Sequence, residues 1–329
     1  MTTTVAIIVA RLTSSRLRAK HFLPLPSDSK GNDKPLIEHV LLRLQCCTEI
    51  NDIFLATTNE IENSPLVEWA IRKKIAYLKY EGDVSDVIGR VDKLISILDP
   101  DYVTFISGDC PLIDPKFIDH ALKRLKTSQS DTIKLANGIK SIHEGMEFYS
   151  KSGWKKLVSV STTKLAREHV GYGDQENPIL EKLEIADIYD YSKIEHRISI
   201  DTNADYEFMY ALYDRWFLKE FNQPTVDLKW VQKQLTFDKK LSLKNAHVVQ
   251  RKALKEYGHV NIYCHIGKKI GLGHFKRSEL IAIAITEYLG LSVCMHIFNK
   301  GNKEINLNIQ NKWYTSQDKF YSAINADKS

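Results

Sequence analysis

Residues 4–20 read "TVAIIVARLTSSRLRAK" and join a short apolar run to a basic loop. The run at 4–10 has the length and the β-branched content of a buried strand. The loop after it holds two serines and the cations Arg11, Arg16, Arg18 and Lys20. In an open α/β sheet, ligands bind beyond the carboxyl ends of the strands, where backbone N–H groups favour anions. The stretch therefore indicates either an anion-binding loop or a solvated basic turn.

The next hundred residues alternate between strand-like and helix-like runs. The pattern predicts strands at 52–58, 75–80 and 101–107, and helices at 35–45, 65–74 and 83–98. Pro35 and Pro65 stand where a first helical turn tolerates proline. Such alternation is typical of a mostly parallel sheet with helices on both faces. We therefore predict an α/β fold, a Rossmann-like three-layer domain.

The remainder of the chain predicts a second, smaller unit. A helix at 115–126, an extended segment at 131–136, a strand at 195–201 and a helix at 203–221 complete a first domain, 1–235. Residues 236–258 are expected to be a connector. Residues 259–329 are expected to form a short C-terminal βαβ fragment, with strands at 259–266 and 291–298 around a helix at 275–289. The polar tail from residue 299 should pack poorly.

Composition narrows the class of protein. The chain has 329 residues and a net charge of +5, and its Lys and Arg are spread along it, which favours acidic or phosphorylated ligands over nucleic acid. Five cysteines without a CxxC pair argue against a disulfide framework and for a cytoplasmic location. No apolar run approaches the roughly eighteen residues of a spanning helix, so no membrane insertion is expected.

Two acidic residues follow predicted strands on the same rim as the basic loop. Asp109 comes after the strand at 101–107, and Asp201 ends the strand at 195–201. Two carboxylates with phosphate oxygens suit Mg²⁺. Each could instead cap the next helix or turn, which is how we interpret Asp114 and Asn203.

Five segments now resemble a known family. They are "VAIIVARLTSSRLRAK", "PLIEHVLLRL", "ISGDCPLIDP", "AREHV" and "ISIDTNADYEFMYALY", in this order. Together they resemble the cytidylyltransferases that activate acidic sugars, closest to the spore coat polysaccharide type and related to the CMP-Kdo and CMP-sialic (nonulosonic) acid synthetases. The resemblance covers roughly residues 1–220. Five motifs that occur in the family's order identify a family more specifically than any single motif does.

The resemblance implies a role for particular residues. Four would act in catalysis, with the last two also holding the metal: Arg16, Lys20, Asp109 and Asp201. The implied nucleotide-binding residues are Ala10, Arg11, Ser14, Ser15, Arg16, Lys20, Gly82, Asp86, Arg90 and Asp109. The implied sugar-binding residues are Glu147, Arg167, Glu168 and His169. Where the family has Pro-Gly before the lysine, this chain has Arg18 and Ala19. Since Ala avoids the positive φ that Gly adopts, the loop is expected to turn differently.

The implied reaction is CMP transfer from CTP to an acidic sugar, nonulosonic or Kdo-like, for surface polysaccharide or glycoconjugate synthesis. A sugar oxygen would attack the α-phosphorus and pyrophosphate would leave, with Mg²⁺ as cofactor. Because nucleophile and phosphates are all negative, positioning and charge neutralisation should supply most of the rate. Relatives also imply a homodimer, for which the aromatic stretch 204–235 could supply the contact.

The C-terminal segment "IGLGHFKR" resembles the first loop of nucleotide-sugar hydrolases and glycosyltransferases with two Rossmann domains. There His274 would lie near a donor sugar. About 70 residues are too few for both halves of such a site, so we expect a truncated, inactive copy. A metal site has no support from ligand spacing, and a structural role is the simpler interpretation of Cys264, His265, His274 and His296.

Two other functions stay open. A metal-dependent glycosyltransferase would present a D-x-D pair at a strand end, whereas "GDCP" supplies one Asp. A non-catalytic nucleotide-sugar binding protein would fit the altered loop and the incomplete second unit, and it would bind CTP without turning it over.

Overall fold

The computed structural model describes residues 2–14, 16–136, 143–190, 196–219, 223–249, 258–267, 272–299, 307 and 309–327. The strands are β1 (Thr4–Val9), β2 (Pro24–Pro26), β3 (Asp33–Pro35), β4 (Asp52–Thr58), β5 (Ala76–Tyr80), β6 (Tyr102–Ser107), β7 (Thr132–Leu135), β8 (Met146–Ser150), β9 (Lys182–Ile185), β10 (His259–Ile266), β11 (Ser292–Asn299) and β12 (Gln310–Tyr314).

The α-helices are α1 (Leu36–Leu44), α2 (Ser64–Lys73), α3 (Val87–Leu98), α4 (Pro115–Lys126), α5 (Lys151–Val160), α6 (Lys164–Glu168), α7 (Tyr172–Glu176), α8 (Asn203–Lys219), α9 (Leu228–Phe237), α10 (Lys239–Ser242), α11 (Gly273–Leu289) and α12 (Gln317–Ala326). Two short 3₁₀ helices are η1 (Lys20–Phe22) and η2 (Ile61–Asn63).

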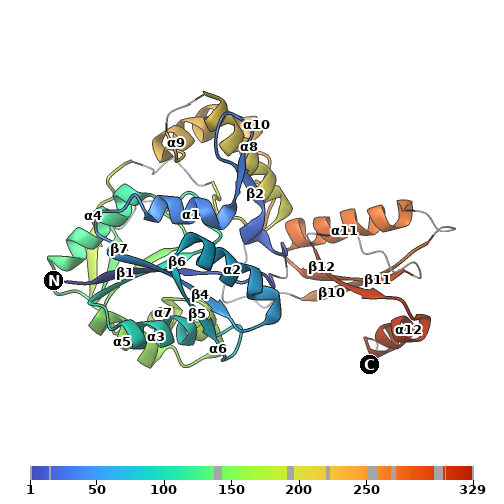
Figure 1. Cartoon of the computed structure of the whole chain (residues 1–329), viewed down its shortest axis with the longest axis horizontal. Helices are drawn as coiled ribbons and strands as arrows, with labels where there is room; N and C mark the ends of the chain where they lie inside the picture. The colour runs from blue at the N-terminus through green and yellow to red at the C-terminus, as the bar shows by residue number, and fades with distance from the viewer. Residues whose placement is uncertain are drawn as a thin grey trace.

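A seven-stranded sheet in the order β5-β4-β1-β6-β8-β7-β9 forms the body of the protein (Figure 1). β5, β4, β1 and β6 are parallel, and β8 runs antiparallel to both β6 and β7. Ala6 and Ile8 of β1 face a core shared with α1, α2 and α4, while Val5 and Ile7 face one shared with α3 and α5. The predicted three-layer, mostly parallel α/β fold is therefore confirmed.

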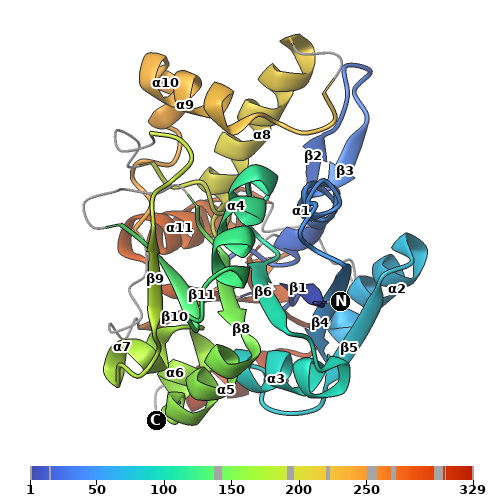
Figure 2. The same ribbon diagram turned by 90° about the vertical axis from the view of Figure 1, so that its left-hand side faces the viewer.

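The helix α8 packs against β2 of the β2–β3 hairpin at one end of this body, and α10 packs against α8 and α9 (Figure 2). Tyr206 of α8 donates to the carbonyl of Pro24 at 2.8 Å. Leu241 of α10 is fully buried in the same core as α8, so the segment expected to begin a connector is packed at its start. The aromatic residues Tyr213, Trp216 and Phe217 are also buried there, which removes most of the patch suggested for dimer contact.

The C-terminal unit is a parallel sheet, β10-β11-β12, beside the main body (Figure 1). Phe275 and Ala282 of α11 pack on one face of it. The expectation of a poorly packed tail is wrong in its described part. Residues 310–314 add the third strand, and α12 buries Phe320 against the rings of Tyr263 and Phe298. Apolar side chains at helical spacing explain the difference.

The predicted strand at 195–201 is also wrong, because its described residues 196–201 form a loop. The backbone N–H of Ile200 donates to the carbonyl of Asp109 at 3.1 Å, and its carbonyl accepts from the Lys20 ammonium at 2.9 Å. These bonds take the place of a strand ladder. Among the described residues, no helix is both long enough and apolar enough to cross a membrane.

Candidate active site

The basic loop after β1 is held by its backbone and by its apolar side chains. Leu12 and Leu17 are buried, so the loop is anchored at two points. The N–H of Leu12 donates to Asn63 Oδ1 at 2.7 Å, and the N–H of Ala19 donates to the carbonyl of Leu12 at 3.0 Å. The loop is therefore not a solvated surface turn. Ala10 is buried at its start, Ser14 lies partly buried within it, and Ser15 falls outside the described residues.

Lys20 joins the two acids that the sequence singled out. Its ammonium contacts a carboxylate oxygen of Asp109 and lies 2.7 Å from Asp201 Oδ1. The third donor goes to the carbonyl of Ile200. Since an ammonium has three N–H donors, all of them are in use. Asp109 and Asp201, 92 positions apart in the chain by their numbers, therefore lie side by side at the carboxyl end of β6.

Two arginines surround the other side of Asp201. Arg16 Nη2 lies 2.8 Å from Asp201 Oδ2, and Arg197 contacts the same oxygen. Asp109 accepts instead from the Ser107 hydroxyl at 2.6 Å. The side chains of Lys20, Asp109 and Asp201 are respectively 8%, 17% and 20% exposed, so the cluster is largely enclosed but keeps some contact with solvent.

Charge decides the protonation of this cluster. Burial alone would lower the pKa of Lys20, but the carboxylates of Asp109 and Asp201 outweigh it and raise that pKa above its ordinary value. Burial would raise the pKa of each acid, but Lys20 holds both below the ordinary range, and Arg16 and Arg197 add to the effect at Asp201. The ammonium and both carboxylates are therefore charged at neutral pH.

The turn after Asp201 is capped by residues other than the one expected. Thr202 and Asp205 cap reciprocally: Asp205 Oδ2 accepts from the N–H of Thr202 at 3.0 Å, and Thr202 Oγ1 accepts from the N–H of Asp205 at 3.3 Å. This is a capping box with Asp at the third position. Asn203 instead donates its side chain to Glu207, so its assignment as the cap is wrong. Asp114 does cap α4, accepting from the N–H of Lys116 at 3.1 Å.

Ala19 adopts the left-handed conformation, with φ 53° and ψ 25°, so the expectation that the loop turns differently from one with glycine is wrong. The loop thus keeps the turn that glycine would make, at a backbone cost of roughly 1–2 kcal/mol for a residue with a Cβ atom.

Ala19→Gly is therefore expected to raise the free energy of unfolding by about 0.5–1 kcal/mol, after allowing for the greater freedom of Gly in the unfolded chain. Urea unfolding of the variant and the wild type measures the change. An unchanged or lower midpoint would show that the left-handed turn at Ala19 is not strained.

A second cluster lies where α3 begins. Asp86 caps the helix by accepting from the N–H of Gly89 at 2.8 Å, and it pairs with Arg167 of α6 through two bonds of 2.8 and 2.6 Å. The Tyr80 hydroxyl donates to the same carboxylate at 3.0 Å. A Cβ atom at Gly89 would lie 2.3 Å from Asp86 Oδ2, so the pair requires glycine there. Asp86 and Arg167, predicted in different subsites, are partners.

Two more predicted arginines converge on one carbonyl. Arg90 Nη2 donates to the carbonyl of Val84 at 2.7 Å and Arg11 Nη1 donates to it at 3.4 Å. Burial, with Arg11 nearby, lowers the pKa of Arg90 to about 10. Gly82 lies in the turn before them, where a Cβ atom would meet the Tyr80 ring at 2.4 Å. Arg11 thus links the loop after β1 to the α3 cluster.

The predicted sugar-binding residues are grouped less tightly. Glu147 on β8 is partly buried, accepts from the Tyr149 hydroxyl, and faces Gly171, where a Cβ atom would lie 2.9 Å from its Oε2. Glu168 is half-buried at the end of α6, and His169 is exposed.

Glu147 predicts a pH dependence. Burial raises the pKa of Glu147 to about 7. Because this folded-state pKa lies above the ordinary value near 4.3, the stabilising effect of the protonated carboxyl is complete below about pH 4 and is lost as the pH rises through 7.

Glu147→Gln mimics the protonated form at every pH. We therefore expect the melting temperature of Glu147→Gln, relative to wild type, to increase between pH 5 and pH 8. Thermal melts across this range measure the difference, and a constant difference would contradict the assignment.

Two further charged residues lie near Asp109 and Asp201 and were not predicted from the sequence. Arg197 could have been predicted as a partner of Asp201, because it precedes Asp201 by four residues in "EHRISID". Arg197 Nε also lies 3.2 Å from Asp205 Oδ1. Glu144, just before β8, gave no signal. Burial, with the charges of Asp201 and Asp109 nearby, raises its pKa, and a hydrogen bond with Ser199 and the charge of Arg197 oppose this rise.

The residues present fit a hard divalent cation. Within the described ranges, no three His, Cys, Asp or Glu side chains form a group that could hold a metal by themselves. Asp109 and Asp201 are two carboxylates that already share one cationic group, the Lys20 ammonium. Mg²⁺ is commonly held by one or two carboxylates together with substrate phosphates. The pair therefore suits a metal that arrives with a nucleotide.

Comparison with known proteins identifies relatives of this chain. The spore coat polysaccharide biosynthesis protein SpsF of Bacillus subtilis is 23% identical over 64% of this chain and 85% of its own length. A 3-deoxy-manno-octulosonate cytidylyltransferase of Geotalea uraniireducens is 29% identical over 42% of this chain and 52% of its own length.

Among solved structures, a cytidylyltransferase from Leptospira borgpetersenii superimposes with a TM-score of 0.63 and 22% identity, covering 76% of this chain and all of that one. This likeness supports the fold.

The cytidylyltransferase family profile matches residues 5–242, which include the loop after β1, Asp109, Asp201 and the α3 cluster. The sequence left three classes open: a cytidylyltransferase, a metal-dependent glycosyltransferase and a non-catalytic nucleotide-sugar binding protein. This match supports the first of them. The chain belongs to the cytidylyltransferase family, enzymes of the nucleotidyltransferase class.

Proposed function

We propose that this cytidylyltransferase transfers CMP from CTP to an acidic sugar of the Kdo or nonulosonic type and releases pyrophosphate, as a step of surface polysaccharide or glycoconjugate synthesis. The observation that carries the proposal is the contact of Lys20 with both Asp109 and Asp201 beside an anchored basic loop. The named activity of the Geotalea relative and the named pathway of SpsF support the choice of substrate.

Unsatisfied guanidinium groups support an anionic ligand at this place. Arg16 Nη1 and Arg90 Nε are buried and have no hydrogen-bond partner in the described part of the chain. A buried N–H donor without a partner costs free energy, which a phosphate oxygen would recover. We assign Arg16 to the triphosphate, and Arg90, with Arg11, to the nucleotide.

In the proposed reaction, a sugar hydroxyl releases its proton to solvent, its oxygen forms a bond to the α-phosphorus, and the bond from that phosphorus to the leaving pyrophosphate breaks. Asp109 and Asp201 would hold Mg²⁺, which when bound lowers the pKa of the attacking hydroxyl and neutralises phosphate charge. Arg16 and Lys20 stabilise the leaving pyrophosphate. Because all three Lys20 donors are in use, Lys20 reaches a phosphate by releasing one of its present partners.

Glu147, Arg167, Glu168 and His169 are proposed for the sugar side. They come from β8, α6 and the residue after α6, next to the cluster at the start of α3. Arg167 already pairs with Asp86, so it would act on the sugar through its remaining N–H groups or by placing Asp86. A homodimer and a cytoplasmic location stay predictions.

A substrate panel tests the proposal. The purified chain is incubated with CTP, UTP, ATP or GTP, with Mg²⁺ or EDTA, and with Kdo, a nonulosonic acid or a neutral hexose, and pyrophosphate is measured. We expect release with CTP, Mg²⁺ and one of the acidic sugars. Equal release with UTP or with the neutral hexose would contradict the assignment, and so would tight CTP binding with no release for any acidic sugar.

A further inference from the structure

The N-terminus of α8 lies one turn from the candidate metal carboxylate. Asp201 immediately precedes Thr202, whose carbonyl accepts the first helical hydrogen bond, from the N–H of Tyr206 at 3.1 Å. The Thr202–Asp205 capping box satisfies two of the N–H donors at this end that have no partner within the helix. A further donor, the N–H of Ala204, remains to be satisfied because the first turn of a helix has no internal partners.

Glu287 of α11 supplies that partner from outside the first domain. Its Oε1 accepts from the N–H of Ala204 at 2.8 Å, between residues 83 positions apart. Its Oε2 lies 2.9 Å from His247 Nε2, and its backbone carbonyl accepts from Val249 at 2.8 Å. Glu287 is 6% exposed, so the carboxylate acts in an enclosed setting. A carboxylate is also the favourable charge at a helix N-terminus.

The segment before α11 makes a parallel contact with the same turn. Asn245 Nδ2 donates to Asp205 Oδ1 at 2.9 Å, and Asp205 Oδ2 accepts from the N–H of Asp201 at 3.1 Å. The backbone of Asp201 is thus tied to the connector through one intermediate residue. Its helix is tied to α11 through Glu287.

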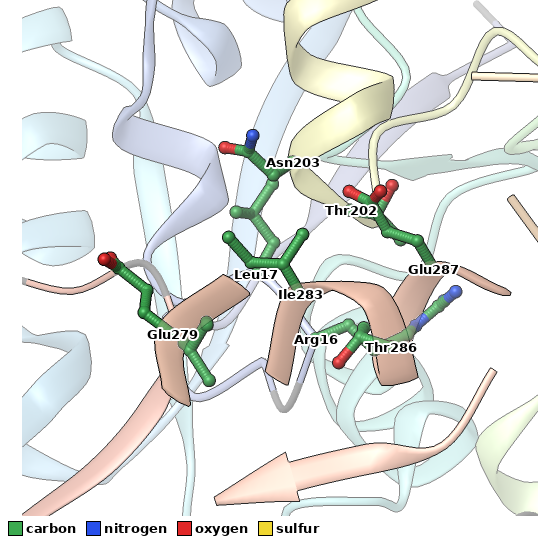
Figure 3. Close-up of a pocket in the computed structure, with 9 residues that line it drawn as sticks. Arg16, Leu17, Thr202, Asn203, Glu279, Ile283, Thr286 and Glu287 are labelled. Carbon is green, nitrogen blue, oxygen red and sulfur yellow. The ribbon is translucent and has the colours of Figure 1, made fainter. Parts of the chain in front are cut away.

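Figure 3 shows that α11 also faces the basic loop across a small cavity. The volume of this cavity is about 110 Å³. Its lining comes from both units: Arg16, Leu17, Thr202, Asn203, Glu279, Ile283, Thr286, Glu287 and Ile309. The cavity is smaller than the ~300 Å³ of typical ligand pockets, so it is too small to enclose a whole nucleotide. The helix therefore contributes to a wall that it shares with Arg16 and Thr202.

We propose that Glu287 is a positioning residue for Asp201, and that the C-terminal unit is thereby part of the framework of the active centre. The family match ends at residue 242, so the contact comes from a part of this chain outside the matched domain. The proposal rests on the assignment of Asp201 made above. It gives the C-terminal unit a role that does not need a sugar-binding site of its own.

The test compares three substitutions at Glu287 in the full chain. Glu287→Ala removes the acceptor, and Glu287→Asp keeps the charge but shortens the side chain so that it no longer reaches Ala204. Glu287→Gln keeps an acceptor oxygen at the same reach. The matched control is Glu279→Ala, which removes a carboxylate from the same helix and the same cavity; Glu279 pairs with Lys276 of its own helix.

The first measurement is the Mg²⁺ dependence of CTP binding by calorimetry, in the absence of sugar. We expect Glu287→Ala and Glu287→Asp to need roughly 10-fold more Mg²⁺, as when an outer partner of a metal ligand is lost. Glu287→Gln should stay within about 3-fold of wild type, and Glu279→Ala should match wild type. The second measurement, amide exchange of residues 200–206 in the metal-free protein, should accelerate in the Ala and Asp variants alone.

A folded Glu287→Ala with wild-type Mg²⁺ dependence would overturn the proposal. If Glu287→Ala does not fold, Glu287→Asp is compared with Glu287→Gln instead. Equal Mg²⁺ dependence of CTP binding in these two variants would overturn the proposal. Where activity is measured, kcat should fall with the sugar KM unchanged. If the wild-type chain binds CTP with Mg²⁺ but turns over no sugar, the proposed function is wrong and the role of Glu287 can still be tested. If the wild-type chain does not bind CTP, both proposals are wrong.

Discussion

Asp201→Asn is expected to lower the rate of pyrophosphate release by about 10²-fold or more, the usual cost of removing one charge-stabilising group. Asn keeps an oxygen for Lys20 but loses the charge that Arg16, Arg197 and Lys20 surround and that Mg²⁺ would need. The release rate is measured at saturating Mg²⁺ and CTP.

The control for Asp201→Asn is Asp131→Asn. Asp131 is a buried carboxylate paired with Lys156 at 2.6 Å, before β7, at the opposite edge of the sheet. Both substitutions are expected to lower stability by about 1–3 kcal/mol, since each leaves a cation without its partner. If the Asp201→Asn variant folds and keeps most of the wild-type activity, the assignment of Asp201 as a metal ligand is wrong.

Lys20→Met is expected to lower turnover by a similar factor of about 10² and to change the response of the protein to Mg²⁺. Without the ammonium, Asp109 and Asp201 face each other as like charges in an enclosed site, which destabilises the folded chain. A divalent cation between them would restore what the ammonium supplied. The Mg²⁺-induced rise in melting temperature should therefore be larger in Lys20→Met than in wild type.

Lys156→Met serves as the comparison for this effect, because it removes the lysine of the Asp131 pair far from the site. It should lose stability with no added response to Mg²⁺. Melting curves in EDTA and in Mg²⁺ measure the difference for all three proteins. Equal Mg²⁺ effects in Lys20→Met and wild type, or wild-type turnover in Lys20→Met, would contradict the role of the ammonium.

Local pattern predicted the parallel half of the sheet well. β1, β4, β5 and β6 are short runs of apolar and β-branched residues between helices with clear apolar periodicity, and their bounds agree with the prediction within about one residue. Parallel strands buried on both faces give this strong signal. The position of Asp109 followed directly, because it comes just after one of these strands.

The antiparallel half could not be predicted in the same way. In β8, Met146 and Phe148 face one core, and Tyr149 faces the other. Glu147 lies on the same face as Tyr149, so a carboxyl group interrupts the apolar pattern of the strand. The acid weakens the apolar signal, and the sequence pattern predicts no strand over residues 146–150. For residues 196–201 the error is the opposite one, because a strand is predicted where the structure has a loop. Its apolar alternation resembles a strand, but its backbone bonds go to Asp109 and Lys20.

Contacts between distant segments were beyond local pattern altogether. Nothing in "TNAD" indicates that the N–H of Ala204 is satisfied by Glu287, and nothing in the α11 segment indicates that one of its acids caps another helix. Ala19 shows the same limit at the level of backbone conformation. Its left-handed φ is imposed by the anchored loop on either side, which overrides the preference of the residue.

The position of a divalent metal in the CTP complex tests the central claim most directly. Crystals of the full chain with CTP and Mn²⁺ would locate the ion by its anomalous scattering. We predict an ion about 2 Å from one carboxylate oxygen of Asp109, one of Asp201 and a phosphate oxygen of CTP, with Lys20 turned to the phosphates. An ion bound elsewhere, with Lys20 still bridging the two carboxylates, would contradict the account.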